Sequence, residues 1–370
     1  MTKALSIAAA VVVALGALEV GVSAYEGHAV SSLLNHPNAE LARLYPQVSK
    51  FLSVEHAHND GGLFNSHVNF DLKLAYPGMP PVSFPVDVAV HHYPWINGSL
   101  SRFSGSFNAP KAGPVADFLR QMHAPVIETF SGKVYPGGSF SAHYVMPGLH
   151  GTTAEKNPVK IDWDGGKVTA DGSSSGFKAH GAMKSATFQL SSATITLSPQ
   201  TIDESFSNAD GQGTSTMTLD IQGLKVHDTQ ANKDLAVIQD IKYGWDAAWD
   251  FAKGAAAPDL GFHLKKFFVS VDAAQPKGNV DGTMHLDANV TRDELLGISK
   301  HSDQSTAKAL ALLPKLNGAA QVSISKDLAA EMGGVDAQLQ SVGFAAQGDN
   351  LVMNVQLQNG HITANGHKLF

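Results

Sequence analysis

The sequence contains no cysteine, and charged residues are scarce. Without cysteine the chain forms no disulfide bond, no thiolate nucleophile and no cysteine-based zinc site. Charged residues make up 16% of the chain, against roughly 25% in an average soluble protein. Because Asp and Glu (33) outnumber Lys and Arg (26), the net charge is −7, and no overall positive field is available to attract nucleic acid. These absences exclude thiol chemistry and argue against a nucleic-acid partner.

Motifs that bind nucleotides are also missing, and no pair of catalytic carboxylates stands out. The segment Gly211-Gln212-Gly213 lacks the third glycine of a dinucleotide loop, and no G-x-x-x-x-G-K sequence occurs. Carboxylates are dispersed along the chain, so no general acid and base pair can be named. We therefore predict no nucleotide, no cofactor and no catalytic residue, and the sequence favours a protein that is not an enzyme.

The apolar residues, 43% of the chain, are enough to bury a sizeable core. Over most of the chain they alternate with polar residues, a pattern typical of strands with one buried and one wet face. In residues 68–74 the alternation predicts that Val68, Phe70, Leu72 and Leu74 are buried and that Asn69, Asp71 and Lys73 are exposed. Turn dipeptides separate the alternating runs: Asn97-Gly98, Asp164-Gly165, Asp171-Gly172, Asp210-Gly211, Asp281-Gly282, Asn317-Gly318, Asn359-Gly360 and Asn365-Gly366. The predicted fold class is mainly β, with elongated, curved antiparallel sheets built from hairpins and meanders.

The first 24 residues have the features of an export segment. A basic start with Lys3 precedes an apolar run from Ala4 to Leu18, which is shorter than the roughly 20 residues of a membrane span and suits the core of a signal peptide. Val22 and Ala24 offer small residues for a cut before Tyr25. Residues 1–24 are thus either a signal peptide or an uncleaved membrane anchor. Both alternatives place the body in the periplasm, anchored to the inner membrane or soluble after cleavage.

A few helices are expected beside the strands. Residues 25–50 form an amphipathic helical lead-in that Pro37 and Pro46 interrupt, and residues 51–370 form the β-rich body. Within that body, capping and stop signals predict helices over 291–313 and 326–332. Residues 241–253 fit a helix or a strand.

Two constellations of residues suggest chemistry. The segment Gly172–Gly176 matches the G-x-S-x-G nucleophile elbow, but its flanks are typical of two hairpin arms, so Ser174 is not predicted to be a nucleophile. His56 and His58 are two residues apart and share one face of a strand, and with Asp60 they are candidate ligands for a divalent metal. A polar strand face carrying histidines is the simpler interpretation.

Three short motifs give the chain a resemblance to a known family. They are Gly62-Leu63-Phe64-Asn65-Ser66, Ile161-Asp162-Trp163-Asp164-Gly165 and the terminal Asn359-Gly360-His361-Ile362-Thr363-Ala364-Asn365-Gly366-His367-Lys368-Leu369. In this order they resemble motifs of the YdgA-like family of bacterial envelope proteins. The sequence departs from that family at Gly61 and at His91-His92-Tyr93-Pro94. The resemblance implies a β-rich, self-associating protein of the periplasm or inner membrane, and it supplies no catalytic residues.

The sequence thus predicts a non-enzymatic envelope protein that presents a large amphipathic β-sheet surface to membrane lipid, to a partner or to a second copy of itself. If the sheet is an open trough, its apolar lining includes Ile195, Leu197, Met217, Leu219, Ile221, Leu286, Val322, Ile324, Val355 and Leu357. In a closed sandwich these side chains would instead meet across a core. The alternative from another class is a periplasmic hydrolase or polysaccharide-binding protein that uses His, Asp and Trp residues in a groove.

Overall fold

The chain divides into two compact units in the computed structural model: unit 1, Met1–Phe177, and unit 2, Lys178–Phe370. The described residues are 36–44, 48–61, 65–75, 80–92, 99, 101–154, 156–173, 175–209, 211–250, 261–290, 311–331 and 335–368. The predicted export segment, residues 1–24, lies outside them, as does most of the predicted helix 291–313.

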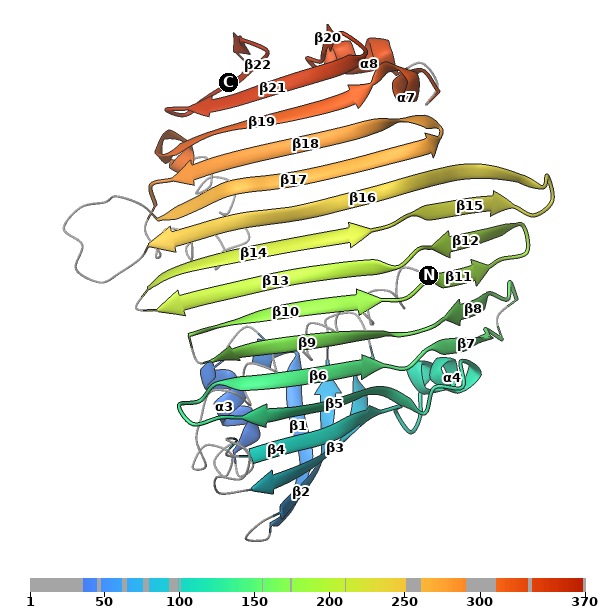
Figure 1. Ribbon diagram of the computed structural model, residues 1–370, viewed down its shortest axis with the longest axis vertical. Helices are drawn as coiled ribbons and strands as arrows, with labels where there is room; N and C mark the ends of the chain where they lie inside the picture. Colours follow the sequence, from blue (N-terminus) through green and yellow to red (C-terminus); the bar gives the residue numbers. More distant parts are fainter. Residues whose placement is uncertain are drawn as a thin grey trace. The chain divides into compact units, whose positions relative to one another are not determined.

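Unit 1 is mainly an antiparallel β-sheet. Its strands are β1 (Leu52–Gly61), β2 (Asn65–Leu74), β3 (Val82–His92), β4 (Ser101–Asn108), β5 (Val126–Val134), β6 (Phe140–Met146), β7 (Leu149–Thr152), β8 (Lys160–Trp163) and β9 (Gly166–Ser173). Strands β1 to β6 lie side by side in the order in which they follow along the chain, and β9 pairs with β6 (Figure 1). β7 and β8 pair with each other as a short hairpin.

The apolar face of β2 confirms the predicted alternation. Val68, Leu72 and Leu74 are at most 5% exposed. Leu72 and Leu74 belong to the main core of unit 1, where side chains of β1, β3 and β4 meet. Phe70 packs against this core but is half-buried.

The polar face of β2 is less exposed than the sequence predicts. Asn69, Asp71 and Lys73 are half-buried because β1 runs beside them. Lys73 Nζ donates to Glu55 Oε1 at 2.8 Å, and His56 Nδ1 lies 2.9 Å from an Asp71 carboxylate oxygen. The prediction was right about the faces and wrong about the degree of exposure.

Short helices accompany the sheet of unit 1. They are α3 (Pro37–Leu44), the 3-10 turn η1 (Val48–Lys50) and α4 (Pro114–Gln121). α3 confirms a helix within the lead-in, and Pro37 begins this helix rather than interrupting it, because a first-turn N–H has no intrahelical partner to lose. Leu41 of α3 enters the main core, and Leu119 of α4 packs with Leu149 and Ile161 of the β7–β8 hairpin. No described helix is both long and apolar enough to span a membrane.

Unit 2 is also mainly antiparallel β-sheet. Its strands are β10 (Gly176–Met183, which begins at the unit boundary), β11 (Ala186–Gln189), β12 (Ala193–Leu197), β13 (Gln200–Ala209), β14 (Gln212–Ile221), β15 (Leu224–Asp228), β16 (Lys233–Asp250), β17 (Phe262–Gln275), β18 (Lys277–Ala288), β19 (Leu316–Ser325), β20 (Ala345–Gln347), β21 (Asn350–Gln358), β22 (His361–Ala364) and β23 (His367–Lys368). A single row of paired strands runs through β10, β13, β14, β16, β17, β18, β19, β21 and β22 (Figure 1). The mainly antiparallel β class is therefore confirmed, and the sheet is not closed.

The ambiguous segment 241–253 belongs to a strand as far as Asp250, since β16 pairs with β14 on one side and with β17 on the other. The spacing of Trp245 and Trp249 suggested a helix. A separation of four residues also returns to the same face of a strand, and both flanking ladders satisfy the β16 backbone.

Turn chemistry was predicted correctly at some dipeptides and wrongly at others. Asn359-Gly360 and Asn365-Gly366 form turns in which both residues have positive φ, from 48° to 83°, as a type I′ hairpin turn requires. Asp171-Gly172, Asp281-Gly282 and Asn317-Gly318 lie inside β9, β18 and β19 instead.

Two of these strand glycines make room for a neighbouring side chain. A Cβ on Gly282 would lie 2.9 Å from Val269 Cγ1, and a Cβ on Gly318 would lie 3.1 Å from Leu286 Cδ1. Glycine is needed at these two positions because residues of the adjacent strand occupy the space that a Cβ would fill, and not because the chain turns.

One corner of the unit 2 sheet is covered by two short helices, α7 (Lys326–Glu331) and α8 (Asp336–Ser341). α7 confirms the helix predicted over 326–332. Ala329 of α7 and Leu351 of β21 are at most 1% exposed and form a core with Phe344. Just before β19, residues 311–312 are helical and the 3-10 turn η4 (Leu313–Lys315) passes through Pro314, which agrees with a helix ending near residue 313.

Candidate functional site

The unit 2 sheet has one predominantly apolar face. Directly opposed residues share a face of a sheet, and the registers place Met217, Trp245, Phe267 and Met284 in one row across four strands. A neighbouring row joins Leu219, Tyr243, Val269 and Val322 through Gly282. We call the apolar side chains of these and the adjoining rows the apolar face: Ile202, Phe206, Met217, Leu219, Ile221, Tyr243, Trp245, Trp249, Phe267, Val269, Met284, Leu286, Val322, Val355 and Leu357.

Eight of the ten residues predicted to line an open trough lie on the same face as these rows. The other two predicted residues, Ile195 and Leu197, are on β12, where they pair with Val226 and Leu224 of β15. The opposite face of the same strands is polar, with Thr218, Thr283 and Gln321 among its residues. The sheet is amphipathic in the manner that the alternation predicts.

The described helices cover only part of the apolar face. α7 and α8 pack over Val322, Ile324 and Met353 at one corner. Elsewhere most side chains of the face are half-buried, and Phe206 and Met284 are each 37% exposed. Contiguous apolar surface of this kind is unusual for a protein that binds nothing.

Aromatic rings form the centre of the apolar face, and the indole N–H groups among them already have partners. Tyr243 packs edge-on against Trp245 and Phe267, with ring centroids 6.0 and 5.3 Å apart. The indole N–H of Trp245 donates to Ser215 Oγ at 3.2 Å, and that of Trp249 donates to Asn208 Oδ1 at 3.2 Å. The rings therefore offer apolar surface without an unsatisfied indole donor.

An acidic residue interrupts the apolar face. Glu204 lies opposite Met217 in the register, between Ile202 and Phe206 on β13. Burial among apolar neighbours raises the pKa of the Glu204 carboxyl above its ordinary value of 4.5. The charge of Glu204 is therefore less favourable in the folded sheet than in water.

The polar faces carry repeated histidine–aspartate pairs. Three of them lie in unit 2, where a histidine Nδ1 meets an aspartate on the neighbouring strand: His180–Asp203, His227–Asp234 and His263–Asp287, at 2.7, 2.8 and 2.5 Å. Hydrogen bonds from His227 and from Lys225 lower the pKa of the Asp234 carboxyl. Ion pairs that remain accessible to solvent contribute little to stability.

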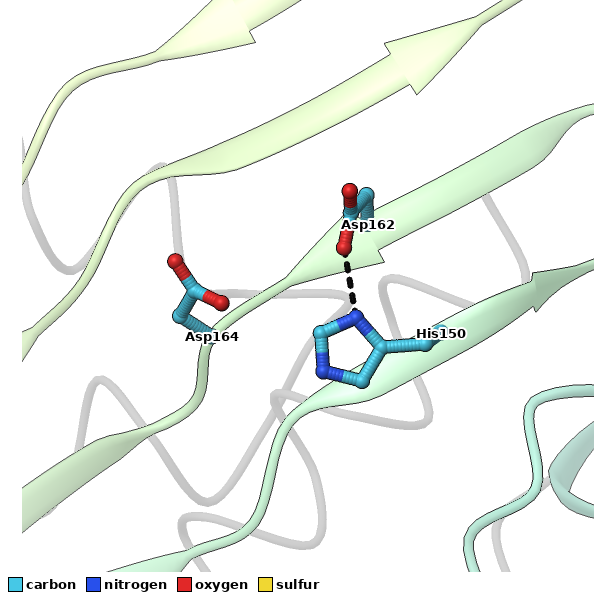
Figure 2. A group of neighbouring side chains, drawn as sticks. All are labelled: His150, Asp162 and Asp164. Atoms are coloured by element: carbon cyan, nitrogen blue, oxygen red, sulfur yellow. Dashed lines mark hydrogen bonds and ion pairs between the residues drawn. The ribbon is translucent and has the colours of Figure 1, made fainter.

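His150, Asp162 and Asp164 form the one described group of three side chains whose ligand atoms lie within 4.8 Å of one another (Figure 2). His150 on β7 stands directly opposite Asp162 on β8, and its Nδ1 lies 2.5 Å from Asp162 Oδ1. Asp164 follows β8 and is two residues beyond Asp162. All three residues are exposed. Sequence reasoning missed this group because His150 is twelve positions from Asp162, although the Asp-x-Asp spacing was a signal that could have found it.

The metal ligands predicted from the sequence are only partly brought together. His58 Nε2 lies 3.1 Å from Asp60 Oδ1. His56 sits in a bulge of β1 with φ 53° and turns to Asp71. The bulge breaks the two-residue period on which the prediction relied, so His56, His58 and Asp60 do not form a three-ligand group among the described residues.

The elbow-like segment Gly172–Gly176 lies between two strands, as the sequence predicts. β9 ends at Ser173 and β10 begins at Gly176, with no helix after it. The hydroxyls of Ser173 and Ser175 are 3.0 Å apart, while Ser174 itself lies outside the described residues. The strand–turn–helix context that a nucleophile elbow requires is absent from this part of the described chain.

A hollow of about 450 Å³ lies on the sheet of unit 1. At its centre the small side chains of Ala89, Ser104 and Ser131 lie in one row between His67 and His143. Its lining is His67, Asp87, Ala89, Ser104, Gly105, Ser106, Thr129, Phe130, Ser131, His143 and Val145. The Asp87 carboxylate accepts a hydrogen bond from Asn108 at 2.9 Å. Among the described residues, no hydrogen-bonded His–Asp–Ser set occurs in the hollow.

The fold and its faces define a β-rich protein with an amphipathic antiparallel sheet. The chain belongs to a family of bacterial proteins of unknown function, DUF945, whose family model matches residues 1–292. An uncharacterised bacterial family agrees with the resemblance found in the sequence, and the narrower YdgA-like assignment stays a prediction. Comparison with curated proteins gave no match, and neither did comparison with solved structures.

Proposed function

We propose that this protein is a non-enzymatic component of the bacterial envelope and that the apolar face of unit 2 binds the acyl chains of membrane lipid. The observation that carries the proposal is the pair of rows through Trp245 and Tyr243, in which apolar side chains follow one another across neighbouring strands without a described helix above their centre. The proposal extends the amphipathic surface predicted from the sequence and names its occupant.

Lipid suits this face better than a protein partner. A specific protein interface uses placed hydrogen bonds, about one per 100–200 Å² of buried area. The centre of the apolar face offers few such groups, because the indole donors of Trp245 and Trp249 are already bonded within the sheet. Acyl chains need no hydrogen bonds, and methionines such as Met217 and Met284 adapt to chains of varied shape.

The location in the envelope rests on the predicted export segment, residues 1–24. It places the body of the protein next to a membrane on the periplasmic side. A reporter enzyme that is active only in the cytoplasm, fused after Phe370, should therefore be silent. An active fusion would place the C-terminus in the cytoplasm and remove this part of the proposal.

Fluorescence quenching tests the contact itself. Phospholipids with brominated acyl chains quench a tryptophan that they touch, and Trp245 and Trp249 lie on the apolar face. We expect brominated lipid, but not its unbrominated equivalent, to quench the protein, and we expect the double replacement of Trp245 and Trp249 by Phe to remove most of that quenching.

The matched control is Trp163→Phe, which removes an indole from β8 in unit 1. Quenching should persist in this variant. Quenching that follows Trp163 instead, or that is equal with both lipids, would contradict the proposal.

A further inference from the structure

Six histidine–aspartate pairs occur among the described residues, and one of them differs from the others. They are His56–Asp71, His58–Asp60, His150–Asp162, His180–Asp203, His227–Asp234 and His263–Asp287. Only beside His150–Asp162 does a third ligating side chain, Asp164, complete a described group within 4.8 Å. The five other pairs show what an ordinary His–Asp pair looks like in this protein.

Local backbone structure fixes the positions of the three side chains. The β7–β8 register sets His150 opposite Asp162. Asp164 lies in the link between β8 and β9, before Gly165, whose φ of +80° is readily adopted by glycine. A Cβ on Gly148 would lie 2.5 Å from His150 Nε2, so the absence of a side chain at this position leaves space for the imidazole ring. The group therefore depends on strand pairing and on two glycines.

The charges of this group are unbalanced. Figure 2 shows the Asp164 carboxylate on the same side of the hairpin as the His150–Asp162 pair. Within the described chain, no Lys or Arg forms an ion pair with either carboxylate. By contrast, Lys225 joins the His227–Asp234 pair at 3.0 Å. Two neighbouring carboxylates without a cationic side chain favour a bound cation.

We propose that His150, Asp162 and Asp164 bind a divalent transition-metal ion of the zinc class. An imidazole nitrogen with two carboxylate oxygens is a ligand set for Zn²⁺ and its neighbours rather than for Mg²⁺, which prefers oxygen ligands alone. Three protein ligands leave a fourth tetrahedral position for water.

Small movements of side chains bring the ligand atoms to bonding distance. Tetrahedral bonds of about 2.0–2.2 Å separate neighbouring ligand atoms by roughly 3.3 Å. The contact between His150 Nδ1 and Asp162 Oδ1, now 2.5 Å, must open, and the widest ligand-atom separation, at most 4.8 Å, must close. The side chains of His150 and Asp162 are 55% and 59% exposed, so they are free to adjust.

Metal titration of the full-length protein, purified without a histidine tag and stripped with a chelator, tests the proposal. We expect ZnCl₂ to bind at one tight site in isothermal titration calorimetry and MgCl₂ to give no comparable site. The Asp164→Asn variant keeps the shape of the side chain and removes its charge, and it should weaken that site at least tenfold. His150→Gln should do the same.

The matched control is His180→Gln, which removes a paired histidine that lies outside the group of His150, Asp162 and Asp164. It should leave the tight site unchanged. Circular dichroism of each variant shows whether folding is preserved, and Asp164→Asn changes only an exposed side chain. Equal zinc affinity in the wild type and Asp164→Asn, or loss of the tight site on His180→Gln, would overturn the proposal.

Discussion

Two leucines on β21 test how much of the apolar face is covered. Leu351 and Leu357 point to the same face of the unit 2 sheet, since they stand six residues apart on one strand. Leu351 is 1% exposed beneath α7 and α8, whereas Leu357 is half-buried outside that corner. The same substitution at the two positions therefore measures the difference in cover.

The expected magnitudes differ because only one substitution leaves a closed cavity. Leu351→Ala should lower the free energy of unfolding by about 2–5 kcal/mol, which combines lost burial with the cost of a cavity. Leu357→Ala should lower it by about 1 kcal/mol, because water reaches the vacated space and only partial burial is lost.

Urea unfolding followed by tryptophan fluorescence provides the assay, since Trp245 and Trp249 report on unit 2. The midpoints should shift with little change in the denaturant slope. Equal losses at Leu351 and Leu357 would mean that both are covered to the same extent, and the reasoning about an open face would be refuted.

Three further predictions concern single side chains. Glu204→Gln should raise the melting temperature at pH 7 and not at pH 3. Burial raises the pKa of Glu204, so ionisation of its carboxyl lowers the stability of the folded protein as the pH rises above 4.5. A gain of equal size at pH 3 would contradict this. Phe70→Asp should destabilise far more than Asp71→Ser, since Phe70 packs on the main core, and equal melting temperatures would count against that packing. Gly105→Ala should cost about 1–3 kcal/mol by overpacking, because its Cβ would lie 2.4 Å from a ring atom of Phe130; an unchanged urea midpoint would exclude the close contact.

The period of two was sufficient to predict the strands and their faces. Val68 and Leu72 are buried where the alternation places them, and Met217 and Leu357 share the predicted apolar face. Alternation is a local property of the chain, so the two faces of a strand can be predicted without knowing which strands pair.

Features that depend on pairing could not be predicted. Asp281-Gly282 has the composition of a turn, but ladders on both sides keep it within β18. His150 and Asp162 meet only because β7 and β8 pair in one register. The bulge at His56 likewise arises in the β1–β2 pairing and changes the direction of one side chain.

The amount of phospholipid that remains with the purified protein tests the central claim most directly. Met284 and Thr283 are adjacent exposed residues of β18 on opposite faces of the sheet. We expect the wild type and Thr283→Arg to retain phospholipid, measured by solvent extraction and mass spectrometry, and Met284→Arg to lose most of it, because an arginine would place a charge among the acyl chains. Equal retention in all three proteins, or a lipid-free dimer that Met284→Arg dissociates, would contradict the account.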